Sequence, residues 1–190
     1  MDIFAGIFSA FGLSASAGLN AYIPLLVVSL LARYTDLIKL NPPYDTLTSE
    51  WIIGLLAILL LIEIFADKFP AVNHVNDAIQ TFVRPVAGAI LFAASANVIS
   101  DVHPVLAMAA GLLVAGSVHA VKSIAVRPIV TATTAGTGNV PVSILEDIIA
   151  TVVSILSIVI PILFGLMLIL MIILVILLVK QRRTGIRTAN

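Results

Sequence analysis

The feature that most constrains this chain is its last apolar run, which extends from Ile144 to Val179. As a single helix it would measure about 54 Å at 1.5 Å per residue, whereas the hydrocarbon core of a bilayer is about 30 Å thick. Pro161 and Gly165 lie near its middle. We therefore predict two membrane spans that turn near Pro161.

The composition extends this conclusion to the whole chain. Of the 190 residues, 61% are hydrophobic and only 11% are charged, whereas soluble domains carry about 25% charged residues. A soluble enzyme, a nucleic-acid-binding protein and a disordered chain are excluded, because a soluble fold of this size could not bury so much apolar surface. The chain has no Cys, so thiolate chemistry is absent, and we expect no cofactor and no bound metal.

The chain has five apolar runs, and the last is expected to divide into two. We therefore predict an all-α membrane helix bundle of about six spans in a single domain, residues 1–190. The predicted spans cover residues 3–32, 51–66, 86–100, 104–126, 144–160 and 162–179. Residues 71–84 alternate apolar and polar positions at helical spacing, which predicts an interfacial helix on the membrane surface. Arg84-Pro85 is expected to end that helix, with Pro85 starting the next span.

The basic residues predict the orientation, because cytoplasmic loops are enriched in Lys and Arg. With six spans, eight of the ten fall on one side: Lys68, Arg84, Lys122, Arg127, Lys180, Arg182, Arg183 and Arg187. Arg33 and Lys39 fall on the other. The first side is therefore predicted to be cytoplasmic, with both termini on it in a multi-pass plasma-membrane protein. A re-entrant first segment would move only the N-terminus.

The first run combines small and polar residues in a way that allows two interpretations. Ser14 and Gly18 are four residues apart, as are Ser16 and Asn20, so small side chains could mark a close helix contact. Alternatively, Gly18, Asn20 and Pro24 interrupt the helix and free backbone groups, which transporters use to bind substrates. We predict an interruption between Ser16 and Pro24 that faces the bundle interior, where Asn20 and Tyr22 help to form a binding site.

Ionisable residues gather near the predicted cytoplasmic ends of two spans. Glu63 and Asp67 are four residues apart, and His119 and Lys122 are three apart, so each pair shares a helix face. Such residues within a membrane are costly and are candidates for function. The alternatives are that Glu63 reaches the interface or pairs with Lys122, and that Lys122 is a headgroup anchor. Ala107, Gly111 and Ala115 form a stripe of small residues leading to His119.

A Gly- and Thr-rich segment follows Arg127 and precedes the fifth span. Ser143 and Glu146 have the spacing of a capping box, and Glu146 with Asp147 suits the positive end of a helix. The backbone of residues 131–139 could alternatively form an anion-binding nest. We expect the two charged linkers to meet in one cluster, in which Asp67, Asp77, Glu146 and Asp147 offset the nearby basic residues.

The motifs together resemble a known family. They are Gly12-Leu-Ser-Ala-Ser-Ala-Gly-Leu-Asn-Ala-Tyr-Ile-Pro24, Ala66-Asp-Lys-Phe-Pro70, Arg84-Pro85, His119-Ala-Val-Lys122 and Ser143-Ile-Leu-Glu-Asp147. In this order they resemble the small bacterial integral membrane proteins catalogued as domain of unknown function 4126. The resemblance covers the first to the fifth span and implies a prokaryotic inner-membrane protein. It brings no activity, substrate or catalytic residue.

The leading functional hypothesis is a small transporter or lipid translocator. Ser14, Ser16, Asn20, Tyr22, Lys68, Arg84, His119, Lys122 and Arg127 are the candidate substrate-binding residues. They suit a small anionic molecule or a lipid headgroup. Glu63, Asp67, Asp77, Glu146 and Asp147 are candidates for proton coupling. The alternatives are a structural or assembly subunit and a membrane-embedded enzyme acting on a lipid phosphate. Membrane lipids are expected partners, and thin walls around a pathway favour a homo-oligomer.

Overall fold

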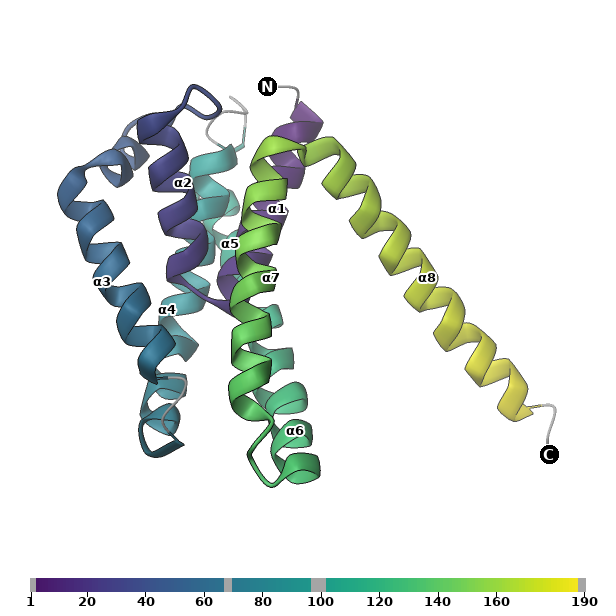
Figure 1. The fold of residues 1–190 in the computed structure, drawn as a ribbon. Helices are drawn as coiled ribbons and strands as arrows, with labels where there is room; N and C mark the ends of the chain where they lie inside the picture. The colour runs from purple at the N-terminus through teal and green to yellow at the C-terminus, as the bar shows by residue number, and fades with distance from the viewer. Residues whose placement is uncertain (1–2, 67–69, 97–101, 188–190) are drawn as a thin grey trace.

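The computed structural model describes residues 3–66, 70–96 and 102–187, and the regular structure in these ranges is entirely helical. In chain order the elements are α1 (Ile3–Leu19), α2 (Tyr22–Tyr34), the 3-10 helix η1 (Tyr44–Thr48), α3 (Glu50–Ala66), α4 (Pro70–Ala96), α5 (Pro104–Val121), the π-helical stretch η2 (Lys122–Val126), α6 (Arg127–Thr134), α7 (Asn139–Val159) and α8 (Pro161–Arg187). Figure 1 shows their arrangement. The predicted all-α class is confirmed.

Within the described residues, three helical stretches are long and apolar enough to cross a membrane. They are Ala78–Ser95, Pro104–Thr134 and Asn139–Val159, and the shorter apolar helices Phe4–Leu19, Tyr22–Tyr34 and Pro161–Leu174 accompany them. Large apolar side chains on the outside, such as Leu55 and Ile58 of α3, are exposed, as expected for helices that face lipid. The chain therefore has the helices of a multi-pass membrane protein.

The first apolar run folds back on itself. α1 ends at Leu19 and α2 begins at Tyr22, and both helices extend from this turn toward the same end of the molecule (Figure 1). Leu13 and Val28, at similar distances from the turn, line one small cavity. The 13 residues of α2 span only about 20 Å, which is less than the bilayer core. The run is therefore a re-entrant hairpin, and the single span expected over residues 3–32 is corrected.

The hairpin also changes where the chain begins relative to the membrane. Arg33, at the end of α2, forms an ion pair with Glu50, the first residue of α3. The end of α2 therefore lies beside the start of α3. α1 begins at this same end of the molecule, whereas α8 runs toward the opposite end (Figure 1). These helix directions contradict the prediction that both termini share one side.

Helix α4 continues through Pro85 without a break. The predicted boundary at Arg84-Pro85, with a separate interfacial helix over residues 71–84, is therefore wrong. A proline inside a helix costs about 3 kcal/mol or more, because it removes a hydrogen bond and crowds the preceding turn. Close packing offsets this cost: a Cβ on Gly88 would lie 2.8 Å from the carbonyl oxygen of Gly111 in α5. The two backbones almost touch, so the tertiary contact keeps α4 continuous.

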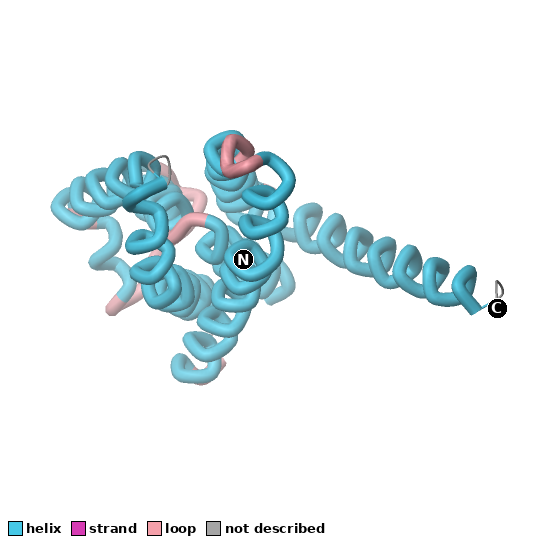
Figure 2. The backbone as a smooth tube through the Cα atoms, turned by 90° about the horizontal axis from the view of Figure 1, so that it is seen from below, coloured by secondary structure: helices cyan, strands magenta, loops and turns pink. Residues whose placement is uncertain are grey.

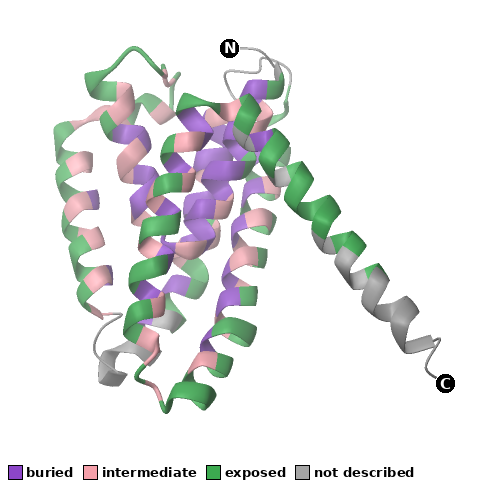
Figure 3. Ribbon diagram, turned by 45° about the vertical axis from the view of Figure 1, so that its right-hand side comes forward, coloured by how far each residue is buried: buried purple, intermediate pink, exposed green. Residues whose placement is uncertain are grey.

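Helix α1 is the central helix, and it packs against α4, α5, α7 and α8. Its buried positions appear purple in Figure 3. The Ser14 hydroxyl donates to the carbonyl of Gly88 at 2.9 Å, and the Ser16 hydroxyl donates to the carbonyl of Ala150 at 2.8 Å. Small residues allow this close approach between helices in a membrane. The packing interpretation of the first run is thus supported for its two serines.

The C-terminal run divides as predicted near Pro161. α7 ends at Val159 and α8 begins at Pro161. Figure 2 shows α8 extending away from the other helices, and its large apolar side chains, such as Leu166, Leu170 and Leu174, are exposed. Apolar exposure along the helix suits contact with lipid or with another copy of the chain.

The segment between α5 and α7 differs from the prediction at two points. α5 continues into η2, where the N–H of Arg127 bonds to the carbonyl of Lys122, the wider spacing of a π-turn. The helix then continues as α6 to Thr134, so the first part of the Gly- and Thr-rich segment is helical and residues 135–138 form a turn. α7 begins at Asn139, with Ser143 and Glu146 buried inside it. The predicted capping box is therefore wrong, because both residues lie beyond the helix start.

Candidate functional site

Asn20 forms the turn of the hairpin. Its side-chain oxygen accepts hydrogen bonds from the backbone N–H groups of Tyr22, at 3.0 Å, and Ile23, at 3.1 Å. Asn is favoured in this capping role at a helix start, and Pro24 lies in the first turn, where its missing N–H is not needed. The predicted interruption is confirmed, but Gly18 lies inside α1 and the turn depends on Asn20.

The tip of the hairpin is tied to two other helical segments. The Asn20 side-chain amide donates to Oδ1 of Asp147 in α7 at 2.9 Å. The carbonyl oxygen of Leu19, at the end of α1, accepts a hydrogen bond from Nζ of Lys122 at 2.8 Å. Backbone groups released inside a membrane must find such partners. The turn therefore places an irregular piece of backbone against charged side chains in the protein interior.

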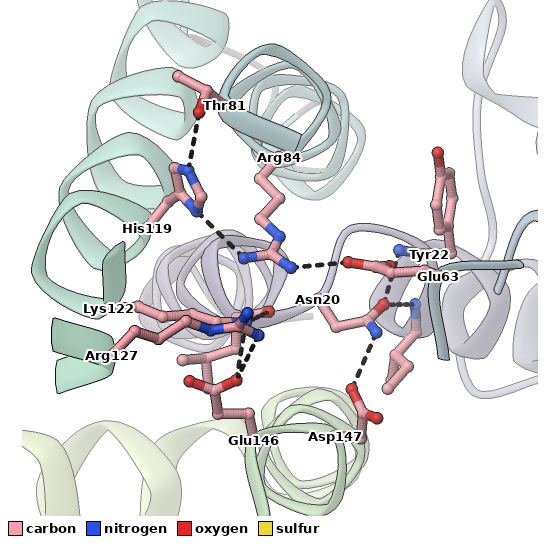
Figure 4. Close-up of polar contacts among 12 residues, drawn as sticks. Asn20, Tyr22, Glu63, Thr81, Arg84, His119, Lys122, Arg127, Glu146 and Asp147 are labelled. Carbon is pink, nitrogen blue, oxygen red and sulfur yellow. Dashed lines mark hydrogen bonds and ion pairs between the residues drawn. The ribbon is translucent and has the colours of Figure 1, made fainter. Parts of the chain in front are cut away.

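Lys122 also belongs to a group of charged residues beside the tip. This group consists of Lys122, Arg127 and Glu146, and we call it the groove cluster. Lys122 Nζ lies 2.8 Å from Oε2 of Glu146, and Arg127 Nη2 lies 3.5 Å from the same oxygen. The side chains are 4%, 11% and 9% exposed, respectively. Two cations thus converge on one carboxylate oxygen beside the hairpin tip (Figure 4).

A second group, which we call the sealed cluster, consists of Glu63, Thr81, Arg84 and His119. Arg84 Nη2 donates to Oε1 of Glu63 at 2.8 Å, and the two side chains are 0% and 1% exposed. Arg84 Nη1 lies 3.1 Å from Nδ1 of His119, and His119 Nε2 lies 3.2 Å from the Thr81 hydroxyl. A guanidinium only donates, so Nδ1 must accept. His119 is therefore neutral, with its proton on Nε2.

The two clusters are balanced in charge only together with Asp147, because the groove cluster alone has two cations and one carboxylate. The described charged side chains around the tip are Arg84, Lys122 and Arg127 against Glu63, Glu146 and Asp147. An unpaired buried ion would cost several kcal/mol, which explains why the charges converge. The alternative pairing of Glu63 with Lys122 is wrong, because Arg84 binds Glu63 and Glu146 binds Lys122. In the described ranges no three His, Asp or Glu side chains group as metal ligands would.

Two buried polar atoms at the sealed cluster find no hydrogen-bond partner in the described part of the chain. They are Oε1 of Gln80 and Nε of Arg84, on side chains that are almost completely buried. Buried polar atoms in folded proteins nearly always have a partner, often an ordered water. The sealed cluster therefore has unused hydrogen-bonding capacity that suits water or a small polar group.

A groove of about 450 Å³ opens beside the groove cluster, between the end of α5 with η2 on one side and α7 on the other. The lining includes Val118, Val121, Leu145 and Ile149, with Lys122 and Glu146 among them. Ligand pockets typically measure about 300–1,000 Å³ and combine apolar walls with a few polar groups. The groove has the size and chemistry of a site for an apolar chain with a charged end.

Most of the predicted site residues meet at the hairpin tip. Figure 4 shows this gathering for Asn20, Tyr22, Glu63, Arg84, His119, Lys122, Arg127, Glu146 and Asp147. The single cluster expected from the two linkers is divided: Arg84 lies in the sealed cluster, and Lys122 and Arg127 lie in the neighbouring groove cluster (Figure 4). The stripe of Ala107, Gly111, Ala115 and His119 is buried as predicted.

The other candidates have different positions. Ser14 and Ser16 lie in the packing contacts of α1. Asp67 and Lys68 lie outside the described residues. Asp77 lies in α4, but the position of its side chain is not among those that the structure describes. The backbone considered for an anion nest uses its N–H groups within the turn: those of Gly136 and Thr137 donate to the carbonyls of Thr131 and Thr134, and that of Gly138 donates to the Thr134 hydroxyl.

The sequence interpretation did not select Gln80, Thr81 or the carbonyl of Leu19 as site groups. Gln80 and Thr81 precede Arg84 by four and three residues, so helical spacing places all three on one face of α4. That face was expected to meet lipid headgroups. In a continuous α4 it meets α3 and α5 instead, which brings these polar groups into the protein interior.

The fold and the site define a class of protein: a multi-pass helical membrane protein with a re-entrant hairpin whose tip meets buried ionic clusters. The chain belongs to the family described as domain of unknown function DUF4126, whose match covers residues 7–181. This confirms the resemblance carried by the motifs and extends it into α8. No curated protein and no solved structure matches the chain. Its function therefore has to be argued from the site.

Proposed function

We propose that this protein is a small integral membrane transporter or lipid translocator for a phosphate-bearing or otherwise anionic substrate. The observation that carries the proposal is the hairpin tip, where Leu19 and Asn20 meet charged side chains beside an open apolar groove. Irregular backbone at membrane depth is tolerated only against protein or water. Transporters use such breaks to bind substrates, which supports this function over a purely structural one.

The proposed orientation follows from the basic residues and the hairpin together. η2, which begins at Lys122 and is followed by Arg127, and the basic end of α8 lie toward the end of the molecule near α6 (Figure 1), and we assign this end to the cytoplasm by the positive-inside rule. The start of α1 is then on the opposite side, together with Arg33 and Lys39. The proposed location is the plasma membrane of a prokaryote, with five crossing helices, one re-entrant hairpin and a cytoplasmic C-terminus.

The hairpin is the proposed moving element. Its tip is tied through Asn20 to Asp147 and through the Leu19 carbonyl to Lys122. An anionic group that binds Lys122 would compete with the Leu19 carbonyl and release one of these ties. Substrate binding would thereby change the position of the hairpin relative to α5 and α7, which is the differential contact that a two-state transporter requires.

The sealed cluster supplies a basis for proton coupling. His119 accepts from Arg84 in its neutral form, so a proton added at Nδ1 would place a second cation against the guanidinium. That repulsion would break the contact and favour a rearranged cluster. Glu63 at the sealed cluster, and Glu146 and Asp147 at the hairpin tip, are the described carboxylates that could take up the exchanged proton.

A homo-oligomer is part of the proposal. The hairpin and few crossing helices form thin walls for a pathway, and α8 exposes apolar side chains along its length. The same exposure supports the second candidate function, a structural or assembly subunit. A lipid-phosphate enzyme has less support, because Ser14 and Ser16 donate to backbone carbonyls rather than to His119.

The test is a translocation assay in liposomes that contain the purified full chain. Fluorescent phospholipid in the inner leaflet becomes accessible to a membrane-impermeant quencher only if it crosses, and efflux of trapped inorganic phosphate is measured in parallel. The wild-type chain should carry one of the two substrates, and the Asn20→Leu variant should carry neither at a comparable protein level. Leu113→Ala, on the exposed face of α5, is the matched control. Transport no faster than in protein-free vesicles, in both assays, would favour the assembly role.

A further inference from the structure

The groove beside α5 and α7 has one apolar part and one charged part. Val118, Val121, Leu145 and Ile149 are apolar residues of its lining. The exposed surface in the groove is almost entirely apolar. An occupant must therefore present mainly hydrocarbon, and in a membrane the available hydrocarbon is an acyl chain.

The charged part is an ion pair that faces this space. Lys122 and Glu146 are 2.8 Å apart, and both line the groove. Their side chains retain 4% and 9% exposure, in contrast to the fully covered pair of Glu63 and Arg84. The pair borders the groove, but its polar atoms contribute almost none of the exposed surface there, so a headgroup reaches the two charges only as the pair separates.

Lys122 lies inside a candidate membrane span, toward its α6 end. α5 has 18 residues, which corresponds to about 27 Å, and the helix continues through η2 and α6, so that Pro104–Thr134 is one candidate span. Lys122 is therefore at the level of the hairpin tip, where it contacts the Leu19 carbonyl. A lipid that enters the groove from the α6 side would place its headgroup at Lys122 and its chain along the groove.

The two charges select the class of headgroup. Lys122 and Glu146 face the same groove, so an anion that reaches the ammonium also approaches the carboxylate, and like charges repel strongly in low dielectric. A zwitterion instead gives Lys122 and Glu146 each a new partner as the pair separates, while Arg127, which does not line the groove, stays beside Glu146. The groove therefore favours a headgroup with adjacent positive and negative groups.

The lining also selects the kind of cation. Quaternary ammonium groups are recognised by the faces of aromatic rings, and none of the described residues that line the groove is aromatic. A primary ammonium instead donates hydrogen bonds, and Glu146 offers carboxylate oxygens that accept them. A primary ammonium is therefore the better match.

We propose that the groove binds a zwitterionic phospholipid with a primary ammonium headgroup. Its phosphate lies on Lys122, its ammonium lies on Glu146, and one acyl chain lies between α5 and α7. This assignment rests on the proposed function and names the substrate class of that site.

Native mass spectrometry of the purified full chain tests the assignment. The protein is mixed with equal amounts of phosphatidylethanolamine, phosphatidylglycerol and phosphatidylcholine that carry identical acyl chains. Phosphatidylethanolamine should be retained about tenfold over the other two, the factor expected for one additional charge-assisted hydrogen bond.

Two variants examine the headgroup and the chain separately. Glu146→Gln removes the partner of the ammonium and leaves Lys122 and Arg127 in place, so the preference should reverse toward phosphatidylglycerol. Ile149→Trp fills the groove and should remove the retention of all three lipids. Ile155→Trp is its matched control, because it lies on the same helix, is similarly exposed (42% against 41%) and does not line the groove.

Three results would overturn the proposal. Equal or stronger retention of phosphatidylglycerol or phosphatidylcholine by the wild-type chain would contradict the headgroup class. Equal retention of all lipids, unaffected by Ile149→Trp, would indicate nonspecific surrounding lipid. Loss of a dimer in Ile149→Trp with unchanged lipid retention would assign the groove to a second copy of the chain.

The binding assay tests the lipid site, and the translocation assay tests the transporter, so the two proposals can be contradicted independently. Selective binding without translocation would leave the lipid site intact and contradict the transporter. Translocation that Ile149→Trp does not affect would leave the transporter intact and remove the groove from its pathway.

Discussion

The sealed cluster and the groove cluster each contain a cation 2.8 Å from a carboxylate, yet they differ in their surroundings. Glu63 and Arg84 are completely enclosed, whereas the groove cluster borders an open apolar space. The same ion-pair chemistry can therefore have two uses. An enclosed pair holds helices together and responds only when the structure rearranges, while a pair at an opening can exchange its partner for a ligand.

The difference arises from helix packing rather than from the charged residues themselves. Arg84 lies one turn before Gly88, where α4 and α5 are in close backbone contact, so neighbouring backbone covers it. Lys122 lies at the end of α5, where the π-helical stretch begins and the groove separates α5 from α7. Small residues close the bundle around one pair, and branched apolar residues leave space beside the other.

The largest expected effect is that of Arg84→Met, which removes one partner of the enclosed pair. It should lower the free energy of unfolding by about 3–5 kcal/mol, because Glu63 is left as a buried charge. Unfolding by a denaturing detergent in micelles measures the change. The double variant Glu63→Leu with Arg84→Met should recover most of the loss. A loss below about 1 kcal/mol in the single variant would show that the cluster is hydrated, as exposed pairs are.

A smaller effect is expected from Glu146→Gln in the groove cluster. We expect a loss of about 1–3 kcal/mol, because water or headgroups in the groove can solvate Lys122. The same unfolding measurement applies, with Leu145→Met as a control on the adjacent lining. A loss as large as that of Arg84→Met would mean that the two clusters are equally enclosed and would remove the contrast between them.

Asn20 connects the hairpin to Asp147 of α7. Its replacement should affect transport much more than it affects stability. Asn20→Leu removes the cap of α2 and should cost about 1 kcal/mol of stability while abolishing transport in the liposome assay. Asn20→Ser keeps a capping oxygen but cannot reach Asp147 in the same way, so it should retain stability and lose transport. If Asn20→Ser transports at the wild-type rate, the tie to Asp147 has no role in the mechanism.

The smallest effect is expected outside both clusters, in the serine contacts of α1. Ser16→Ala removes the hydrogen bond that its hydroxyl donates to the carbonyl of Ala150, a carbonyl to which the Ser154 hydroxyl also donates at 2.6 Å. Hydrogen bonds between membrane helices contribute about 0.6 kcal/mol on average, so stability should fall by about that amount. Transport should be unchanged. A loss of transport at normal stability would place Ser16 in the substrate pathway, as one of the two sequence interpretations proposed.

Local sequence patterns predicted the elements that depend on local chemistry. The interruption near Asn20, the turn at Pro161 and the buried stripe that ends at His119 could all be predicted, because capping, proline geometry and small-residue spacing act over a few neighbouring residues. The prediction failed at Pro85 and Ser143. There the local signals for a helix boundary were present, but packing against other helices kept α4 continuous and placed the start of α7 earlier.

The sequence by itself determined that this chain is a helical membrane protein, because lipid accepts only segments that satisfy their own backbone hydrogen bonds and the apolar runs have the required length. It also determined that polar and charged residues would collect near the hairpin. Only the tertiary structure decided that the hairpin turns back, that Glu63 pairs with Arg84 and Lys122 with Glu146, and which pair borders a groove. The physical reason is that ion pairing and burial depend on distances between helices that are far apart in the chain, and no local pattern specifies those distances.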